Sequence, residues 1–193
     1  MLRDGDRDLT DTVEMGSHAV TYYSSLYRSE QPCIQTGLID RVVPQLVTDE
    51  ENDLLVALPS EDEIKQAIFA MNPHSAPGPD GFTGFFYRSC WPIICREVVR
   101  AVVMFFEQGR IAHGFNANTV ALIPKKPGAD RISDFRPIAM ANFAFKIITK
   151  ILSDRLGGIA SRILSPEQTG FVRGRHIHTS IGLVSECYNM LDC

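Results

Sequence analysis

Three short motifs between residues 118 and 180 decide the fold. In chain order they are TVALIPKK at residues 119–126, DFRPI at 134–138 and QTGFVRGR at 168–175. The first two are apolar runs in which a proline stands next to a cation, and a Pro-Gly turn separates them. This pattern predicts an antiparallel pair of strands over 118–126 and 135–140.

Amphipathic segments surround the predicted pair of strands. Their apolar residues recur every three or four positions, which is typical of helices. The expected helices cover 15–28, 60–72, two segments within 82–108 that break at Trp91-Pro92, 141–156 with an end at Gly157-Gly158, a short turn at 159–164, and 179–191. The fold class is therefore predicted to be α+β, mostly helical, with a small antiparallel sheet.

The clearest signal for a helix start is PSEDE at residues 59–63. Ser60 is expected to cap the backbone amide of Glu63, and the Glu63 side chain is expected to reach back, which together form a capping box. The stretch 75–82, SAPGPDGF, predicts a rigid loop, because its prolines fix φ and its glycines allow unusual backbone angles.

The first part of the chain has less regular patterning. Residues 1–14 are rich in Asp and lack periodicity, so a frayed N-terminus is expected. Residues 29–58 combine prolines, glycine and acidic residues, and they predict an irregular linker with short pieces of structure. The predicted domains are thus 1–57, an extension with one helix, and 58–193.

Charge is distributed unevenly over the 193 residues, whose net charge is −4. Residues 1–63 hold 14 Asp/Glu and 4 Lys/Arg, a net charge of −10, whereas residues 110–175 hold 4 Asp/Glu and 11 Lys/Arg, a net charge of +7. An asymmetry of this size between regions is more informative than the total charge.

Lys125, Lys126 and Arg136 would lie near one another if the two strands pair. Such a cluster suits the phosphates of a nucleotide or a nucleic-acid backbone. The alternative is a solvated hairpin tip with scattered charge, since exposed Lys is the commonest case.

Two further groups of cations could contact a phosphate backbone. Lys146 and Lys150 share a helix face, with Arg155 and Arg162 further along, although they could equally form the solvent side of an amphipathic helix. In the third motif, Gly170 and Gly174 let the backbone approach a ligand, and Arg173 and Arg175 supply forked donors. Plain surface is the alternative there too.

Several classes of site are not indicated. No catalytic triad or P-loop stands out. The five Cys form no CxxC pair, which makes a zinc site improbable. No apolar run approaches the roughly 18 residues that a membrane span needs, and the charged start is unlike a signal peptide. We expect reduced thiols and a location inside the cell, in the nucleus or the cytoplasm.

The motifs taken together resemble those of a known family. SAPGPDGF at 75–82, Cys90-Trp91, LIPKK at 122–126, DFRPI at 134–138, KIITKIL at 146–152, DRL at 154–156 and QTGFVRGR at 168–175 follow one another with sensible gaps. This order is similar to that of reverse transcriptases of non-LTR (LINE-type) retrotransposons. The sequences of the motifs are most like those of the plant members. The resemblance covers about residues 58–191.

The resemblance implies the fingers and the beginning of the palm of a right-hand polymerase. It implies that Lys125 and Arg136 contact the triphosphate of the incoming dNTP, and that Gln168, Gly170 and Phe171 lie near that nucleotide. Template binding is expected from Lys146, Lys150, Arg173, Gly174 and Arg175. The implied partners are an RNA template, a DNA primer, dNTP and the downstream palm and thumb of the same polyprotein, with no membrane.

Polymerases of this type hold two Mg²⁺ ions on Asp residues. Neither the Lys-Ala-Phe-Asp-like motif nor the Ala-Asp-Asp motif of the family occurs in this sequence. We therefore expect no metal to be held by this chain and no polymerisation by the chain alone. It is expected to be a fragment of an RNA-directed DNA polymerase. The alternative is a catalytically dead nucleic-acid-binding remnant or a pseudogene product.

Overall fold

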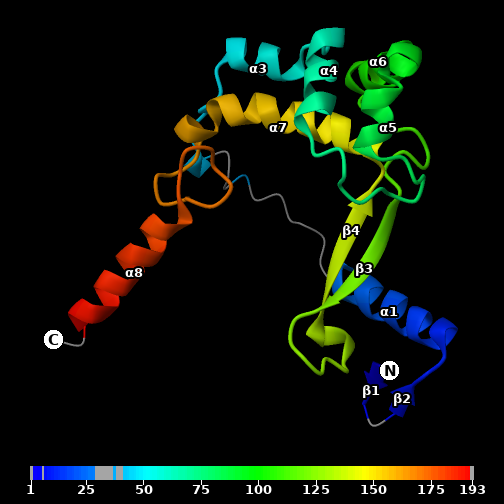
Figure 1. Cartoon of the computed structure of the whole chain (residues 1–193). Helices are drawn as coiled ribbons and strands as arrows, with labels where there is room; N and C mark the ends of the chain where they lie inside the picture. The colour runs from blue at the N-terminus through cyan, green and yellow to red at the C-terminus, as the bar shows by residue number, and fades with distance from the viewer. Residues whose placement is uncertain (1, 6, 29–36, 38–40, 192–193) are drawn as a thin grey trace. The chain divides into compact units, whose positions relative to one another are not determined.

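The computed structural model describes residues 2–5, 7–28, 37 and 41–191 (Figure 1). The chain forms two compact units: unit 1 comprises Met1–Pro44 and Asn118–Met140, and unit 2 comprises Gln45–Ala117 and Ala141–Cys193. The structure is mostly helical with two small antiparallel sheets, which confirms the α+β prediction. The predicted domain boundary after residue 57 stays a prediction.

Unit 1 begins with a hairpin where the sequence predicted a frayed end. Strand β1 (Leu2–Asp4) pairs antiparallel with β2 (Arg7–Leu9), and Leu2 lies opposite Leu9. Both leucines are buried against Ile132, which is distant in sequence. The prediction was wrong because strands this short have no readable periodicity, and their order depends on that distant partner.

Helix α1 (Thr12–Leu26) follows the hairpin. Its N-cap is Asp11, whose carboxylate accepts hydrogen bonds from the amides of Val13 and Glu14 at 3.1 and 3.0 Å. This cap satisfies two of the amides that a helix start leaves unpaired. The helix covers the hairpin's core, in which the partly buried residues are Met15, Ala19, Tyr22, Tyr23, Leu122 and Phe135.

The second sheet of the molecule confirms the predicted pair of strands. Strand β3 (Asn118–Pro124) pairs with β4 (Phe135–Ala141), and a short 3-10 helix, η1 (Ile132–Asp134), leads into β4. Each strand stops close to the expected residue, and the connection between them contains Pro127, which has no backbone N–H for a ladder of hydrogen bonds.

Unit 2 contains α3 (Asp49–Val56), α4 (Glu61–Ala70), α5 (Gly84–Ser89) and α6 (Trp91–Gln108). The predicted break at Trp91-Pro92 is confirmed, since Cys90 ends α5 and Pro92 lies in the first turn of α6. A proline suits that position because the first amides of a helix have no partner within it. Gly109, at φ +62°, ends α6 in the left-handed conformation.

Helix α7 (Phe143–Ile163) is longer than the sequence predicted, and α8 (Ile177–Leu191) follows it. The predicted end at Gly157-Gly158 is wrong, because the helix continues through both glycines. Each glycine costs about 1 kcal/mol relative to Ala in a helix. Arg155 and Arg162 are both tied to distant parts of unit 2, and these contacts hold the helix through the weak pair.

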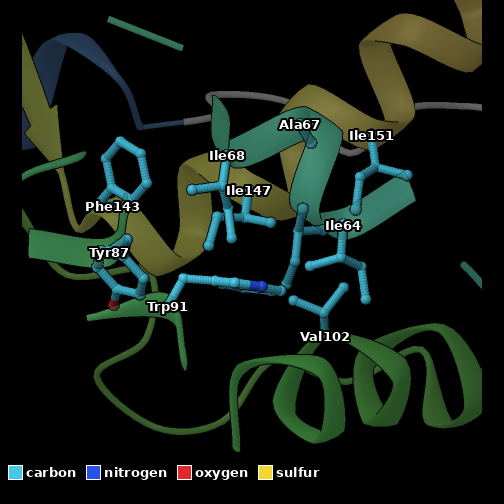
Figure 2. Close-up of a cluster of buried hydrophobic side chains, with 10 residues drawn as sticks. Ile64, Ala67, Ile68, Tyr87, Trp91, Val102, Phe143, Ile147 and Ile151 are labelled. Carbon is cyan, nitrogen blue, oxygen red and sulfur yellow. The ribbon is translucent and has the colours of Figure 1, made fainter. Parts of the chain in front are cut away.

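The core of unit 2 lies where α4, α5 and α6 pack on α7 (Figures 1 and 2). Its fully buried side chains include Ile64, Ile68, Val102 and Ile147, and Trp91 spans the middle of the cluster. Deleting one such side chain typically costs 2–5 kcal/mol. This core therefore fixes α7 and, with it, the residues at both ends of that helix.

The helix start at Ser60 is confirmed in part. The Ser60 hydroxyl accepts a hydrogen bond from the amide of Glu63 at 3.1 Å. The Glu63 carboxylate, however, pairs with Arg155. A complete capping box forms instead at Thr48 and Glu51, at the start of α3. Glu51 keeps its bond to the Thr48 amide although it also pairs with Arg162, whereas both carboxylate oxygens of Glu63 are taken by Arg155.

Candidate nucleotide and nucleic-acid site

The β3–β4 hairpin of unit 1 carries the first predicted cluster of cations. Lys125 follows β3, and its Nζ donates a hydrogen bond to the carbonyl of Ser133 at 2.7 Å. Lys126 forms an ion pair with Asp134 at 3.0 Å. Both lysines are exposed, so these contacts contribute little stability and can be exchanged for a ligand's phosphates at small cost.

Arg136 differs from its two neighbours on the hairpin. It lies on β4, where Phe135 and Pro137 on either side are partly buried and Arg136 itself is exposed. Within the described part of the chain, its guanidinium has no hydrogen-bonding or charged partner. Five N–H donors are thus open to a ligand, in a geometry that matches phosphate or carboxylate oxygens.

The third motif forms a turn in unit 2 between α7 and α8. The Gln168 side chain donates to the carbonyl of Gly170 at 3.1 Å, and the hydroxyls of Thr169 and Ser180 lie 2.8 Å apart, which ties the turn to α8. Val172 is buried. These contacts hold the turn from inside and from α8.

Phe171 stands out within that turn. Its φ is +64°, and among the described residues it is the one non-glycine residue with positive φ. Its side chain is fully exposed, at 111% of the reference area. Such a backbone conformation costs about 1–3 kcal/mol and persists only where the surroundings enforce it. Strain of this kind clusters at functional sites, and nothing in the sequence pattern signalled it.

Arg175 and Arg173 occupy different environments. The guanidinium of Arg175 donates hydrogen bonds to the carbonyls of four residues, namely Ser161, Leu164, Ser165 and Gln168. The side chain of Arg173 is exposed and has no partner among the residues described. Of the two, Arg173 is the one with donors available to a nucleic acid.

The cations on α7 are partly engaged. Lys146 Nζ donates to the carbonyl of Ala76 at 2.9 Å, which ties α7 to the loop at 75–82. Lys150 pairs with Asp154 at 2.6 Å, one helical turn away. A pair of this type contributes about 0.3–0.5 kcal/mol, so a phosphate could replace Asp154 as the partner of Lys150.

Arg155 and Arg162 stabilise the fold instead of forming a solvent face. Arg155 holds both Glu63 oxygens at 2.7 and 2.8 Å and lies over the ring of Phe106 at 5.1 Å. It also donates to the carbonyls of Leu55 and Ala57. Arg162 contacts Glu51 and the carbonyl of Leu46. Neither of the two open interpretations of these arginines, phosphate contact or solvated face, describes what they do.

Asn142 is a residue that the sequence analysis did not single out. It is buried before the first turn of α7, but its side chain caps no helix amide. Its Oδ1 accepts from the amide of Asp80 at 3.2 Å, and its Nδ2 donates to the carbonyl of Gly114 at 3.1 Å. An Asn just before an apolar helix is a signal for a cap. Here it fastens the 75–82 loop to α7.

Gly78 explains why this loop needs glycine. A Cβ at this position would lie 2.3 Å from the Asn142 nitrogen and 2.6 Å from the Ala141 carbonyl carbon. Both distances are far shorter than van der Waals contact. The predicted rigid loop is therefore also a closely packed loop, lying directly against the start of α7.

In unit 2, the pKa values of Tyr87 and Glu167 are shifted near the 75–82 loop and the 165–175 turn. Burial, with a smaller contribution from the charge of Asp80, raises the pKa of Tyr87 to about 12. In the turn before α8, a hydrogen bond from the Ser165 hydroxyl lowers the pKa of the Glu167 carboxyl, and the charge of Arg175 lowers it further. Tyr87 is thus held as a neutral phenol, and Glu167 as a carboxylate.

Among the described residues, no group of three or more His, Cys, Asp or Glu side chains gathers in a way that could hold a metal ion. The residues present do not fit the Mg²⁺ ions that the family resemblance implies, and no step through a metal is derived. Cys90, Cys95 and Cys187 are free thiols, and Cys33 and Cys193 lie outside the described residues.

The predicted site residues divide between the two units. Lys125 and Arg136 belong to unit 1, on one hairpin. The residues of the 168–175 turn belong to unit 2, as do Lys146 and Lys150. Each group has an exposed arginine without a partner in the described part of its unit, namely Arg136 and Arg173.

Comparison with known proteins gives this arrangement a context. No protein-family model matches the chain. It is 26% identical over 180 residues to the transposon TX1 uncharacterized 149 kDa protein of Xenopus laevis. It is 28% identical over 126 residues to a retrovirus-related Pol polyprotein from the type-1 retrotransposable element R2 of Nasonia vitripennis. The chain is similar to proteins of non-LTR retrotransposons.

A third relative is a retrovirus-related Pol polyprotein from the type-2 retrotransposable element R2DM of Drosophila melanogaster, 32% identical over 98 residues. The matches cover 92%, 65% and 51% of this chain but only 14%, 12% and 9% of the relatives. These relatives come from a frog and two insects, so they do not support the expected likeness to plant members.

Within the described part of the chain, no helix combines the length and the apolar content that a membrane span needs.

Proposed function

We propose that the chain is the N-terminal reverse transcriptase region, fingers and early palm, of a LINE-type retrotransposon protein. In the full protein this region binds the RNA template and the incoming dNTP while RNA is copied into DNA. The motif order and the similarity to Pol polyproteins support the proposal. They do not favour the alternative of an inactive remnant.

The observation that carries the proposal is the exposed guanidinium of Arg136 on the β4 strand, which has no partner among the residues that the structure describes. Lys125 and Lys126 extend the positive charge along the same hairpin, and their present partners are a carbonyl and one exposed ion pair. Three cations with open or exchangeable donors suit a triphosphate, whose oxygens accept charge-assisted hydrogen bonds.

In unit 2 we assign the template side. Arg173 has no partner within the described ranges, Lys150 can exchange Asp154 for a phosphate, and Lys146 lies one turn before Lys150. Phe171, which the resemblance places near the incoming nucleotide together with Gln168 and Gly170, presents an exposed ring on which a template base can stack, and Gly174 lies in the same turn. Aromatic stacking and phosphate contacts together are the usual means of holding a single strand.

The implied partners and location follow from the proposed activity. The partners are an RNA template, a DNA primer, dNTP and the remaining palm and thumb of the same polyprotein. The metal chemistry of the reaction belongs to residues outside this sequence. The place of action is inside the cell, in the nucleus or the cytoplasm.

The test uses a full-length element protein that carries this region. Arg136→Ala removes the open guanidinium, and we expect kcat/KM for dNTP to fall by about 10- to 100-fold, because hydrogen bonds to charged groups contribute about 1.5–3 kcal/mol. Arg131→Ala is the matched control, since Arg131 is an exposed arginine of the same hairpin. Unchanged steady-state kinetics for Arg136→Ala would remove its proposed role.

A second measurement uses the chain itself. Affinity for an unstructured oligouridylate should fall as salt rises, with a slope of about −0.7 for each phosphate contact to a single strand. Arg173→Ala should reduce this slope. Absence of any binding at low salt would count against a template role for the residues of unit 2.

A further inference from the structure

The end of α7 and the turn that follows it are held together by one side chain. A helix leaves its last four carbonyls without partners inside the helix. Arg175 approaches these carbonyls from 11 residues beyond the last turn and lies partly buried against them. Positive side chains at this end of a helix also interact favourably with its dipole.

The hydrogen bonds of Arg175 account for both terminal nitrogens of its guanidinium. One nitrogen donates to Ser161 at 2.9 Å and to Leu164 at 3.1 Å, both at the end of α7. The other donates to Ser165 at 2.5 Å and to Gln168 at 2.8 Å, both in the turn. Four N–H donors thus meet four carbonyls, and the fork joins the helix to the turn.

The same turn contains the strained residue. The backbone amide of Arg175 donates to the carbonyl of Val172 at 3.1 Å, and Gly174 between them has φ +80°. Phe171, at φ +64°, is the residue just before this closed turn. The side chain of Arg175 fixes one end of the segment at Gln168, and its amide fixes the other end at Val172. Phe171 lies between these two fixed points.

We propose that Arg175 is a positioning residue: its guanidinium locks the 165–175 turn onto the end of α7, which keeps Phe171 exposed in the left-handed conformation. This role replaces direct template contact by Arg175. Its consequence for RNA binding rests on the proposed function, because it acts through the stacking of a base on Phe171. The clamp itself is a property of the fold and can be measured without RNA.

Lysine and alanine variants separate the two roles of Arg175. If Arg175 contacted a phosphate of the RNA, Arg175→Lys would preserve binding, because the positive charge remains. A clamp does not, because an ammonium group has a single nitrogen and cannot span four carbonyls on two segments. We therefore expect Arg175→Lys to behave like Arg175→Ala. Arg173→Lys and Arg173→Ala are the matched controls, two residues away on the same turn.

The first measurement is amide hydrogen exchange without RNA. Both Arg175 variants should exchange at least about tenfold faster in residues 165–175, because each hydrogen bond lost loosens the turn. The Arg173 variants should match the unmodified chain. Fluorescence of Trp91, the one tryptophan of the sequence and a buried core residue, checks that the variants stay folded. Exchange at the unmodified rate in Arg175→Lys would overturn the proposal.

The second measurement is binding to oligouridylate over a range of salt. Both Arg175 variants should bind more weakly with an unchanged salt slope, and this loss should vanish in a Phe171→Ala background. A general loss of structure would weaken both backgrounds equally. If Arg175→Lys binds like the unmodified chain and Arg175→Ala reduces the salt slope by about 0.7, Arg175 contacts an RNA phosphate directly, and the proposal is overturned. If the unmodified chain does not bind the oligomer, the proposed function fails, and the exchange comparison alone decides the role of Arg175.

Discussion

Replacing Gly78 by alanine should strongly destabilise unit 2. The added Cβ would lie 2.3 Å from the Asn142 nitrogen and 2.4 Å from its Oδ1. Side chains rarely relieve a clash with backbone atoms, so the loop must move away from α7. Gly78 has no positive φ, and the effect is therefore purely one of space.

The magnitude follows from what the movement breaks. The amide of Asp80 loses its hydrogen bond to Asn142, whose side chain is buried. An unsatisfied buried group costs about 1–3 kcal/mol, and overpacking costs about 1–3 kcal/mol more. The expected loss is about 2–6 kcal/mol, a large fraction of the roughly 5–15 kcal/mol that stabilises a typical domain.

The assay is urea unfolding followed by the fluorescence of Trp91, which lies in the core of unit 2. Gly157→Ala is the matched control, because nothing lies within 4 Å of a Cβ at that helical position. It should raise the free energy of unfolding by about 1 kcal/mol. If Gly78→Ala leaves that free energy unchanged, the loop does not pack on Asn142 as described, and the reasoning fails.

Three further predictions concern other parts of the chain. Arg155→Leu should lower the free energy of unfolding by about 2–4 kcal/mol, because Glu63 is left without its partner. If the double variant with Glu63→Gln regains stability, the pairing is confirmed. If the single and the double variant lose the same free energy of unfolding, the pairing is contradicted. Leu9→Ala should cost about 2–5 kcal/mol in unit 1, measured by thermal unfolding, because Leu9 is 2% exposed; an unchanged midpoint would mean that the N-terminal hairpin does not contribute. The pKa of Tyr87 rises from 10.0 to about 12 on folding. Its contribution to the free energy of unfolding, up to roughly 3 kcal/mol, is therefore complete below pH 10 and is lost as pH rises to 12. Tyr87→Phe should remove this pH dependence from alkaline unfolding curves, and a dependence that persists would assign it to other groups.

Local signals were sufficient for many elements of the fold. The sequence predicted the start of α4 at Ser60, the break before Pro92 and the two strands β3 and β4. Each of these features depends on residues within a few positions. Caps, prolines and short apolar runs act through the geometry of the adjacent backbone. Such features can be predicted from neighbouring residues alone, without knowing any distant contact.

The errors have one physical cause. The N-terminal hairpin was missed because Leu2 and Leu9 are ordered by Ile132, more than a hundred residues later. The end of α7 was placed too early because Arg155 and Arg162 hold the helix on both sides of Gly157-Gly158. In both cases tertiary packing overrode the local propensity.

The candidate site shows the same division. The sequence by itself determined which residues carry charge and the order of the motifs, and that order pointed to the proteins of non-LTR retrotransposons. Only the tertiary structure decided which cations are available. In the part of the chain that the structure describes, Arg136 and Arg173 have open donors, whereas Arg155 and Arg175 are occupied by carboxylates and carbonyls of the fold. A guanidinium carries the same charge in either role, so the identity of its partners, set by contacts between distant residues, decides its function.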